Sequence, residues 1–196
     1  MNFKDTCLIR QEVILDDDVV NALGPGLILD HCHIISNATS RAILIGGFTM
    51  NGGVFDQKHS LQNFHFERAH FSGVRFTGSY SGCDFGDWDS SERPSIVDCD
   101  FTEAKLDGVR FLQCDVSRIQ FPKWPCFVIV NPVSVREHVL AQSWPNQIGL
   151  TLDVYTDEDP ECVAVVGDAA RIAKQNNVPL DDLRDLMMQI PGIVSD

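Results

Sequence analysis

The sequence predicts a mainly β fold, a right-handed parallel β-solenoid followed by a C-terminal α/β or helical cap. Two observations lead to this prediction. A large apolar residue recurs at every fifth position through the middle third of the chain. The recurrence then stops at residues 122–125 (PKWP), where two prolines interrupt strand pairing. We therefore expect residues 1–121 to form the solenoid and residues 122–196 to form the cap.

The five-residue recurrence is regular from Leu61 to Phe121. In triplets such as 99–101 (CDF) the first residue is small or β-branched, the second is polar and the third is large and apolar. Neither the helical period of 3.6 nor the strand period of 2 produces this spacing, whereas a coil that turns a corner every five residues does. Four such sides close a turn of roughly 20 residues, so Phe101 is expected beside Phe121 in the next turn. The expected core residues are Phe66, Phe71, Phe76, Phe85, Phe101, Leu106, Phe111, Val116 and Phe121.

The repeat is interrupted once and is less regular upstream. After Phe76 the register slips to Phe85, and residues 87–94 (DWDSSERP) are expected to bulge from one corner as a loop. The spacing of five continues upstream through Leu29, Ile34, Leu44 and Val54, which indicates coils from about Leu27 onward. Ordinary strands also fit this part of the sequence, because it contains an apolar run and a glycine-rich run.

Several triplets resemble the motif of the pentapeptide-repeat family, often written A(D/N)LXX. They lie at 69–71 (AHF), 83–85 (CDF), 99–101 (CDF) and 104–106 (AKL). The resemblance implies a four-sided β-helix. It also implies a possible function, since some members of the family look like duplex DNA in shape and charge and protect DNA gyrase.

The segment after the repeat reads as alternating strands and helices. Residues 126–130 (CFVIV) are expected to form a buried strand, 132–143 a helix and 148–155 a second strand. Asp159 followed by Pro160 is typical of a helix start, which predicts a helix to about Lys174. A last helix is expected over 180–190. These helices would cover the end of the solenoid or form a homodimer surface.

Composition and charge narrow the function. The chain has 196 residues and a formal net charge of −13, with ten acids against three bases in residues 153–196. A nucleic-acid binder needs a basic surface, so direct binding to nucleic acid is not expected. There is no apolar stretch long enough for a membrane span and no secretory signal, so a cytoplasmic location is expected. The expected partner is a protein, either a basic toxin or a nucleic-acid-binding enzyme.

No motif in the sequence calls for catalysis, a cofactor or a metal. The seven cysteines form no C-x-x-C pair and are read as reduced core thiols. In the run 30–33 (DHCH), His31 and His33 would share one face of a strand and Cys32 the other, so a metal site is not expected. Asp16, Asp17 and Asp18 fit a turn or a helix cap. Nucleotide-binding and nucleophile-elbow patterns are missing.

We therefore expect a non-enzymatic binding module that uses acidic surfaces. The favoured version is a bacterial immunity protein that neutralises a cognate toxin, and the alternative is a DNA mimic that protects gyrase. A third possibility is a carbohydrate-active β-helix enzyme with paired carboxylates. The candidate partner-binding residues are Asp84, Asp87, Asp89, Glu92, Asp153, Asp157, Glu158 and Asp159.

Overall fold

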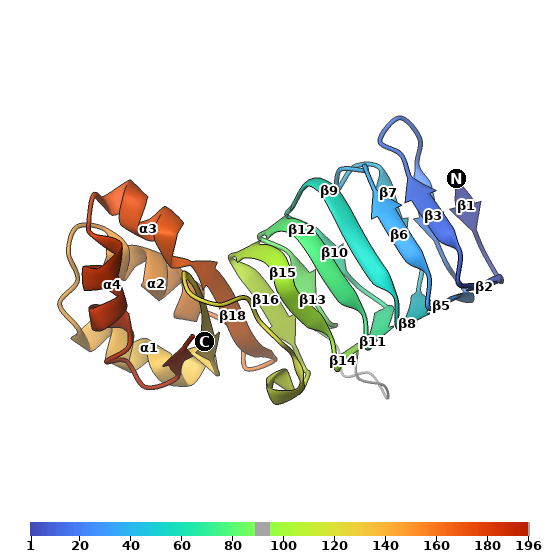
Figure 1. The fold of residues 1–196 in the computed structure, drawn as a ribbon. Coiled ribbons are helices and arrows are strands. Elements are labelled where there is room, and N and C mark those ends of the chain that lie inside the picture. Colours follow the sequence, from blue (N-terminus) through green and yellow to red (C-terminus); the bar gives the residue numbers. More distant parts are fainter. Residues whose placement is uncertain (89–94, 196) are drawn as a thin grey trace.

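The chain winds into a stack of parallel coils that ends in a sheet covered by helices (Figure 1). This arrangement is seen in a computed structural model, which describes residues 1–88 and 95–195. The mainly β fold predicted from the repeat is confirmed as a parallel β-solenoid with a C-terminal α/β cap. Most of the predicted loop, from Asp89 to Pro94, lies outside the described residues.

Strands from successive coils stack in parallel on three faces. The first face contains β2 (Cys7–Ile9), β5 (Leu27–Asp30), β8 (Phe48–Asn51), β11 (Ala69–Ser72) and β14 (Ile96–Val97). The second contains β3 (Glu12–Leu15), β6 (His33–Ser36), β9 (Val54–Gln62), β12 (Arg75–Ser81) and β15 (Asp100–Asp107). The third contains β1 (Asn2–Phe3), β4 (Asn21–Leu23) and β7 (Ile43–Ile45), and further along the stack β10 (His65–Phe66), β13 (Asp84–Phe85) and β16 (Val109–Leu112).

The corner after the first face repeats one backbone conformation in coil after coil. Its residues, Arg10, His31, Gly52, Gly73 and Asp98, all have a positive φ of 51° to 65°. A left-handed residue turns the chain sharply between two strands. The repeated corner therefore fixes where each strand ends.

The upstream coils contain one residue more per turn than the repeat predicts. In the first face Leu8 pairs with Leu29, Leu29 with Met50 and Met50 with Phe71, each step being 21 residues. A pattern of five therefore drifts out of phase. Leu44, an expected inward residue, is wrong because it is 59% exposed, and the coils begin at β1 rather than near Leu27.

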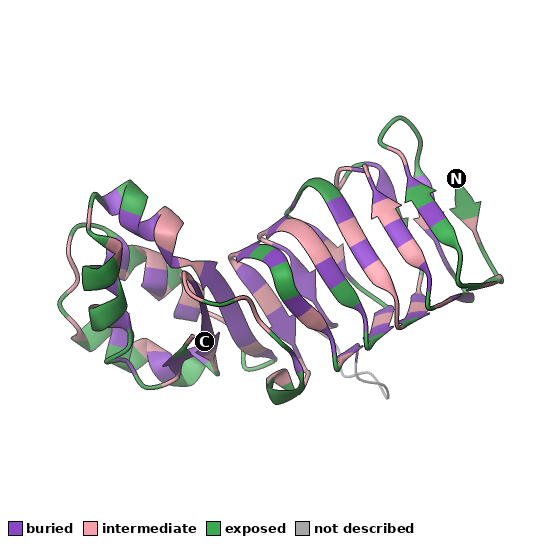
Figure 2. Ribbon diagram, viewed as in Figure 1, coloured by how far each residue is buried: buried purple, intermediate pink, exposed green. Residues whose placement is uncertain are grey.

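Phenylalanines form two stacks inside the solenoid. Phe76 stacks on Phe101 with ring centroids 4.5 Å apart and an interplanar angle of 3°. Phe101 stacks in turn on Phe121 at 6.5 Å, as the sequence predicts. The second stack joins Phe85 to Phe111 at 5.5 Å and packs edge-on against the first. The buried residues form continuous stripes across the coils (Figure 2).

The predicted core is buried except at its last two positions. Val116 and Phe121 are only partly buried and pack against the core from its rim. The reason is local, because the chain leaves the strand pattern there for a short 3-10 helix, η1 (Val116–Arg118). Only an isolated bridge between Asp100 and Gln120 continues the second face.

The cap extends the third face of the solenoid as an antiparallel sheet. β18 (Cys162–Asp168) pairs antiparallel with β16 and with β17 (Cys126–Val130), which also pairs with β19 (Ile193–Val194). Four helices within the described residues pack on this sheet: α1 (Pro132–Ala141), α2 (Ile148–Thr156), α3 (Ala169–Asn176) and α4 (Leu180–Met187). None of them is long and apolar enough to cross a membrane.

Two secondary-structure predictions for the cap are wrong. Residues 148–155 alternate apolar and other residues like a strand, yet they form α2, which buries Ile148 and Leu152 on one side. The predicted helix over 160–174 is instead β18 followed by α3. Ala164 and Val166 of β18 join the solenoid core, whereas Cys162 and Val165 join the helical core. The strand is apolar on both faces because it lies between two cores, which hides its period of two.

We expect Gly78→Ala to destabilise the fold far more than Gly73→Ala. Both glycines have a positive φ, which costs an alanine roughly 1–2 kcal/mol. A Cβ at Gly78 would also lie 1.9 Å from the carbonyl oxygen of Gln57, whereas a Cβ at Gly73 meets nothing within 4 Å. Urea unfolding of both variants measures the difference. Equal losses of stability would contradict the close coil spacing at Gly78.

We expect Phe101→Ala to lower the free energy of unfolding by about 3–5 kcal/mol, because it opens a cavity in the middle of the stack. Phe121→Ala is the matched control, and its cost is smaller because Phe121 is only partly buried at the end of the same stack. The check is chemical denaturation of the two variants beside the wild type. A control as costly as Phe101→Ala would show that the stack does not end there.

Candidate protein-binding surface

The two predicted acidic groups meet at one arginine where the solenoid joins the cap. Asp84 of β13 lies beside Arg110 of β16 in the parallel ladder. Arg110 donates two hydrogen bonds to its carboxylate, Nε to Oδ1 at 2.6 Å and Nη2 to Oδ2 at 2.8 Å. Its Nη1 lies 3.4 Å from Oε2 of Glu158, and the guanidinium sits 5.1 Å from the ring centre of Trp88.

This geometry corrects the expectation that Asp84 points to solvent. The side chains of Asp84 and Glu158 are only 9% and 12% exposed. Burial raises the pKa of Glu158 above its usual value, although Arg110 opposes the shift. Both carboxylates thus hold the cap to the solenoid, and neither presents a free charge to a partner.

A second polar cluster ties the same two parts together. Tyr155 of α2 donates a hydrogen bond of 2.9 Å to Asp107 at the end of β15. Arg171 of α3 donates to the Tyr155 hydroxyl at 2.7 Å and pairs with Asp107 at 2.5 Å. Burial raises the pKa of Tyr155, so the phenol keeps the proton that it donates. With the Arg110 cluster, this contact fixes the orientation of the cap.

The other predicted residues lie in different settings. Asp87 accepts a hydrogen bond of 2.7 Å from the backbone N–H of Arg68, which closes a corner. Asp153 and Asp157 both pair with Arg136 of α1, and Asp153 does so at 3.0 Å. Asp159 is exposed and makes no ion pair within the described residues. Asp89 and Glu92 lie outside the described residues.

The acids of α2 belong to a surface that the sequence analysis did not find. Val133 and Leu140 flank Arg136 along α1, and Leu150 and Val154 flank Asp153 along α2. All four aliphatic side chains are exposed, between 45% and 62%. We call these residues, together with Arg136, Asp153 and Asp157, the α1–α2 face. Its signal in the sequence was hidden, because the alternation of Leu150 and Val154 with buried residues resembles a strand.

Exposed aliphatic side chains around charged residues are typical of protein-binding surfaces. Helix α1 is apolar on both sides, since it buries Val135 and Val139 while it exposes Val133 and Leu140. A helix whose only contacts are with its own core has no need of the outer set. The α1–α2 face is therefore the best candidate for contact with a partner.

The histidines and cysteines do not form a reactive site. His31 lies 2.9 Å from Asp30, and His33 lies 3.8 Å from Asp56. Within residues 1–88 and 95–195, no three His, Cys, Asp or Glu side chains are placed to hold a metal ion. The cysteines are free thiols, and burial raises the pKa of Cys83 and Cys99 to about 11. These two thiols stay protonated and unreactive at neutral pH.

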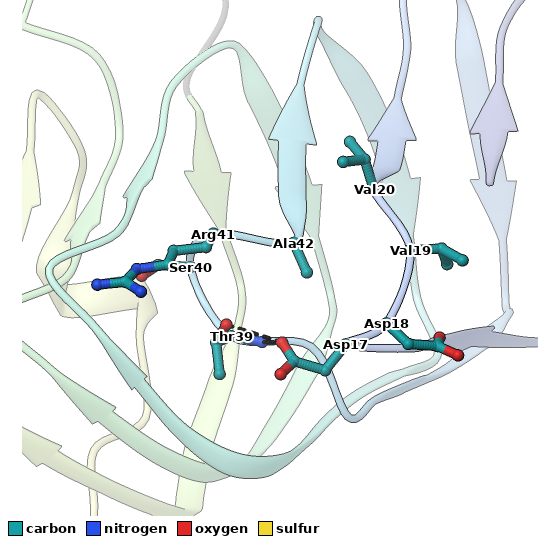
Figure 3. Close-up of a pocket in the computed structure, with 8 residues that line it drawn as sticks. All are labelled: Asp17, Asp18, Val19, Val20, Thr39, Ser40, Arg41 and Ala42. Carbon is teal, nitrogen blue, oxygen red and sulfur yellow. Dashed lines mark hydrogen bonds between the residues drawn. The ribbon is translucent and has the colours of Figure 1, made fainter.

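An open hollow of about 490 Å³ lies between the loops that follow β3 and β6 (Figure 3). Asp17 accepts hydrogen bonds of 2.7 Å from the backbone N–H and the hydroxyl of Thr39, and these bonds lower its pKa. The predicted turn at Asp16–Asp18 is therefore confirmed. Arg41 points away from Asp18 in the close-up, so the charged groups do not converge on one point.

Comparison with protein-family models, with curated proteins and with solved structures gave no match for this chain.

We expect Arg110→Met to lower the free energy of unfolding by about 3–5 kcal/mol, because it leaves two buried carboxylates without a counter-ion. The loss should shrink as the pH falls and these carboxyls take up protons. The matched control is Arg118→Met, which removes a two-bond ion pair with Asp98 where both side chains are 53% exposed. Its cost should stay below about 1 kcal/mol. Thermal or urea unfolding that ranks the two variants equally would contradict the role given to Arg110.

Proposed function

We propose that this protein is a non-enzymatic binding module that neutralises a basic protein, as an immunity protein does with its toxin. The observation that carries the proposal is the α1–α2 face, where exposed aliphatic side chains surround two carboxylates. The face lies on the most acidic part of the chain, since residues 153–196 hold ten acids and three bases. Charge complementarity of this kind favours a basic partner and speeds association.

The rigid attachment of the cap supports the same proposal. The Arg110 and Tyr155 clusters join the cap to the solenoid through charged and hydroxyl groups that are largely buried. The sheet also runs without interruption from β16 through β18 to β17. A surface that is already ordered loses little entropy when it binds, which favours tight binding.

We place DNA mimicry second, although membership of the pentapeptide-repeat family would allow it. A mimic of DNA needs acids at regular intervals along a face. The outward ladder of the second face instead reads Glu12, His33, Val54, Arg75, Asp100 and Gln120. Arg75 also lies 3.4 Å from Asp100 and offsets its charge.

The proposal is tested by affinity capture from the native cell with the wild type and with Leu150→Lys. The substitution places a cation in the α1–α2 face, so we expect loss of a basic partner and loss of protection against it on co-expression. Ile28→Lys is the matched control, because Ile28 is also exposed and aliphatic but lies on the first face of the solenoid. Its binding should be unchanged.

Two results would contradict the proposal. Capture that is unchanged by Leu150→Lys but reduced by Ile28→Lys would move the binding surface to the solenoid. Inhibition or protection of gyrase supercoiling by the purified protein would favour DNA mimicry instead.

A further inference from the structure

The first coil of the solenoid has an open edge on all three faces. Strands β1, β2 and β3 each end their sheet, and each pairs on one side only, with β4, β5 and β6 respectively. Within the described part of the chain, nothing pairs with their outer sides. Figure 1 shows this edge at the end of the molecule opposite the helices.

The outward backbone groups of this edge can be assigned. The carbonyls of Gln11 and Leu15 accept hydrogen bonds from the N–H groups of His33 and Asn37, at 2.9 and 2.8 Å. Residues of a strand alternate between its two sides, so the N–H and C=O groups of Glu12 and Ile14 point to the open side. These groups form a template for another strand.

This edge lacks the usual protection against pairing. Exposed edge strands are commonly blocked by lysine, by proline or by a bulge. β2 and β3 read CLI and EVIL, with regular ladders and without lysine or proline. Ile9 is 56% exposed and Ile14 is 43% exposed beside the free backbone groups.

The opposite end of the solenoid limits what can pair here. β18 lies antiparallel on β16 and occupies the end of the third face. A second copy cannot therefore continue the stack head to tail on that face. Two copies that meet through their first coils make a closed contact, since the same surface is used on both.

Charge decides how two first coils would align. A twofold axis across the second face sets β3 antiparallel to β3 of the other copy, and β2 against β1. When Glu12 faces Ile14 of the other copy, both with outward backbone groups, Arg10 faces Asp16. Within the described residues, Arg10 and Asp16 form no ion pair of their own. Opposite charges thus meet at both ends of the pairing.

We propose that the first coil is a self-association surface through which two copies of this chain join edge to edge, with β3 antiparallel to β3. The contact leaves both α1–α2 faces free at the far ends of the dimer. It does not depend on the function proposed above.

The first test is the mass of the purified chain in solution, measured by light scattering or sedimentation. We expect the mass of two chains for the wild type and for Ile14→Val, which keeps the edge N–H. Ile14→Pro removes that N–H on the open side, where an edge strand tolerates proline. It should be monomeric, with an unchanged circular dichroism spectrum. A monomeric wild type, assemblies larger than two, or a dimer that survives Ile14→Pro would overturn the proposal.

The second test is a charge exchange, which does not depend on the folding of the proline variant. Arg10→Asp and Asp16→Arg should each raise the dimer Kd by roughly tenfold or more. The double variant should restore the wild-type Kd, because the opposite charges meet again. A double variant as weak as the single ones would overturn the antiparallel alignment. A dimer that dissociates in Leu150→Lys would overturn the proposal as well, since it would place the contact on the C-terminal helices.

Discussion

Parallel pairing between successive coils is the interaction on which the whole structure depends. A single coil cannot satisfy its own backbone or bury its own large side chains, so each coil is stable only against its neighbours. The pairing places equivalent positions on top of one another, and this is why Phe76, Phe101 and Phe121 stack in one column. It also forces the corner residues into one repeated left-handed conformation.

The same constraint explains the form of the two ends. At one end β18 supplies an antiparallel strand and then packs its other side against helices, so the stack passes into a second core. At the other end the strands of the first coil keep free backbone groups. The cap and the edge therefore offer two different surfaces, one built from side chains and one from backbone, and we assign them to a partner protein and to self-association.

The fold was predictable where one repeated position dominates the sequence. Phe66 to Phe111 announce the inward positions because large apolar residues there have no exposed alternative. The upstream coils were harder, since an added residue per turn moves the corner glycines and shifts Leu44 outward. The cap was misread for a physical reason, because β18 lies between two cores and α2 carries apolar residues on two sides, which hides the period of each.

The candidate site was less predictable than the fold. Sequence charge located Asp153 and Asp157 near a surface, but it could not show that Arg136 lies between α1 and α2 beside them. Nor could it show that Asp84 and Glu158 share Arg110, because these residues are far apart in the chain. Such pairings depend on which strands become neighbours, and this is set by coil length and by the insertion of β18.

The account rests on coils that stack in parallel with a step of 21 residues in the first face. Nuclear Overhauser contacts between backbone protons test this step directly. We predict contacts that join Leu29 to Met50 and Met50 to Phe71 in parallel register. Contacts in antiparallel register, or a step that differs from the 21 residues between these positions, would contradict the solenoid described here.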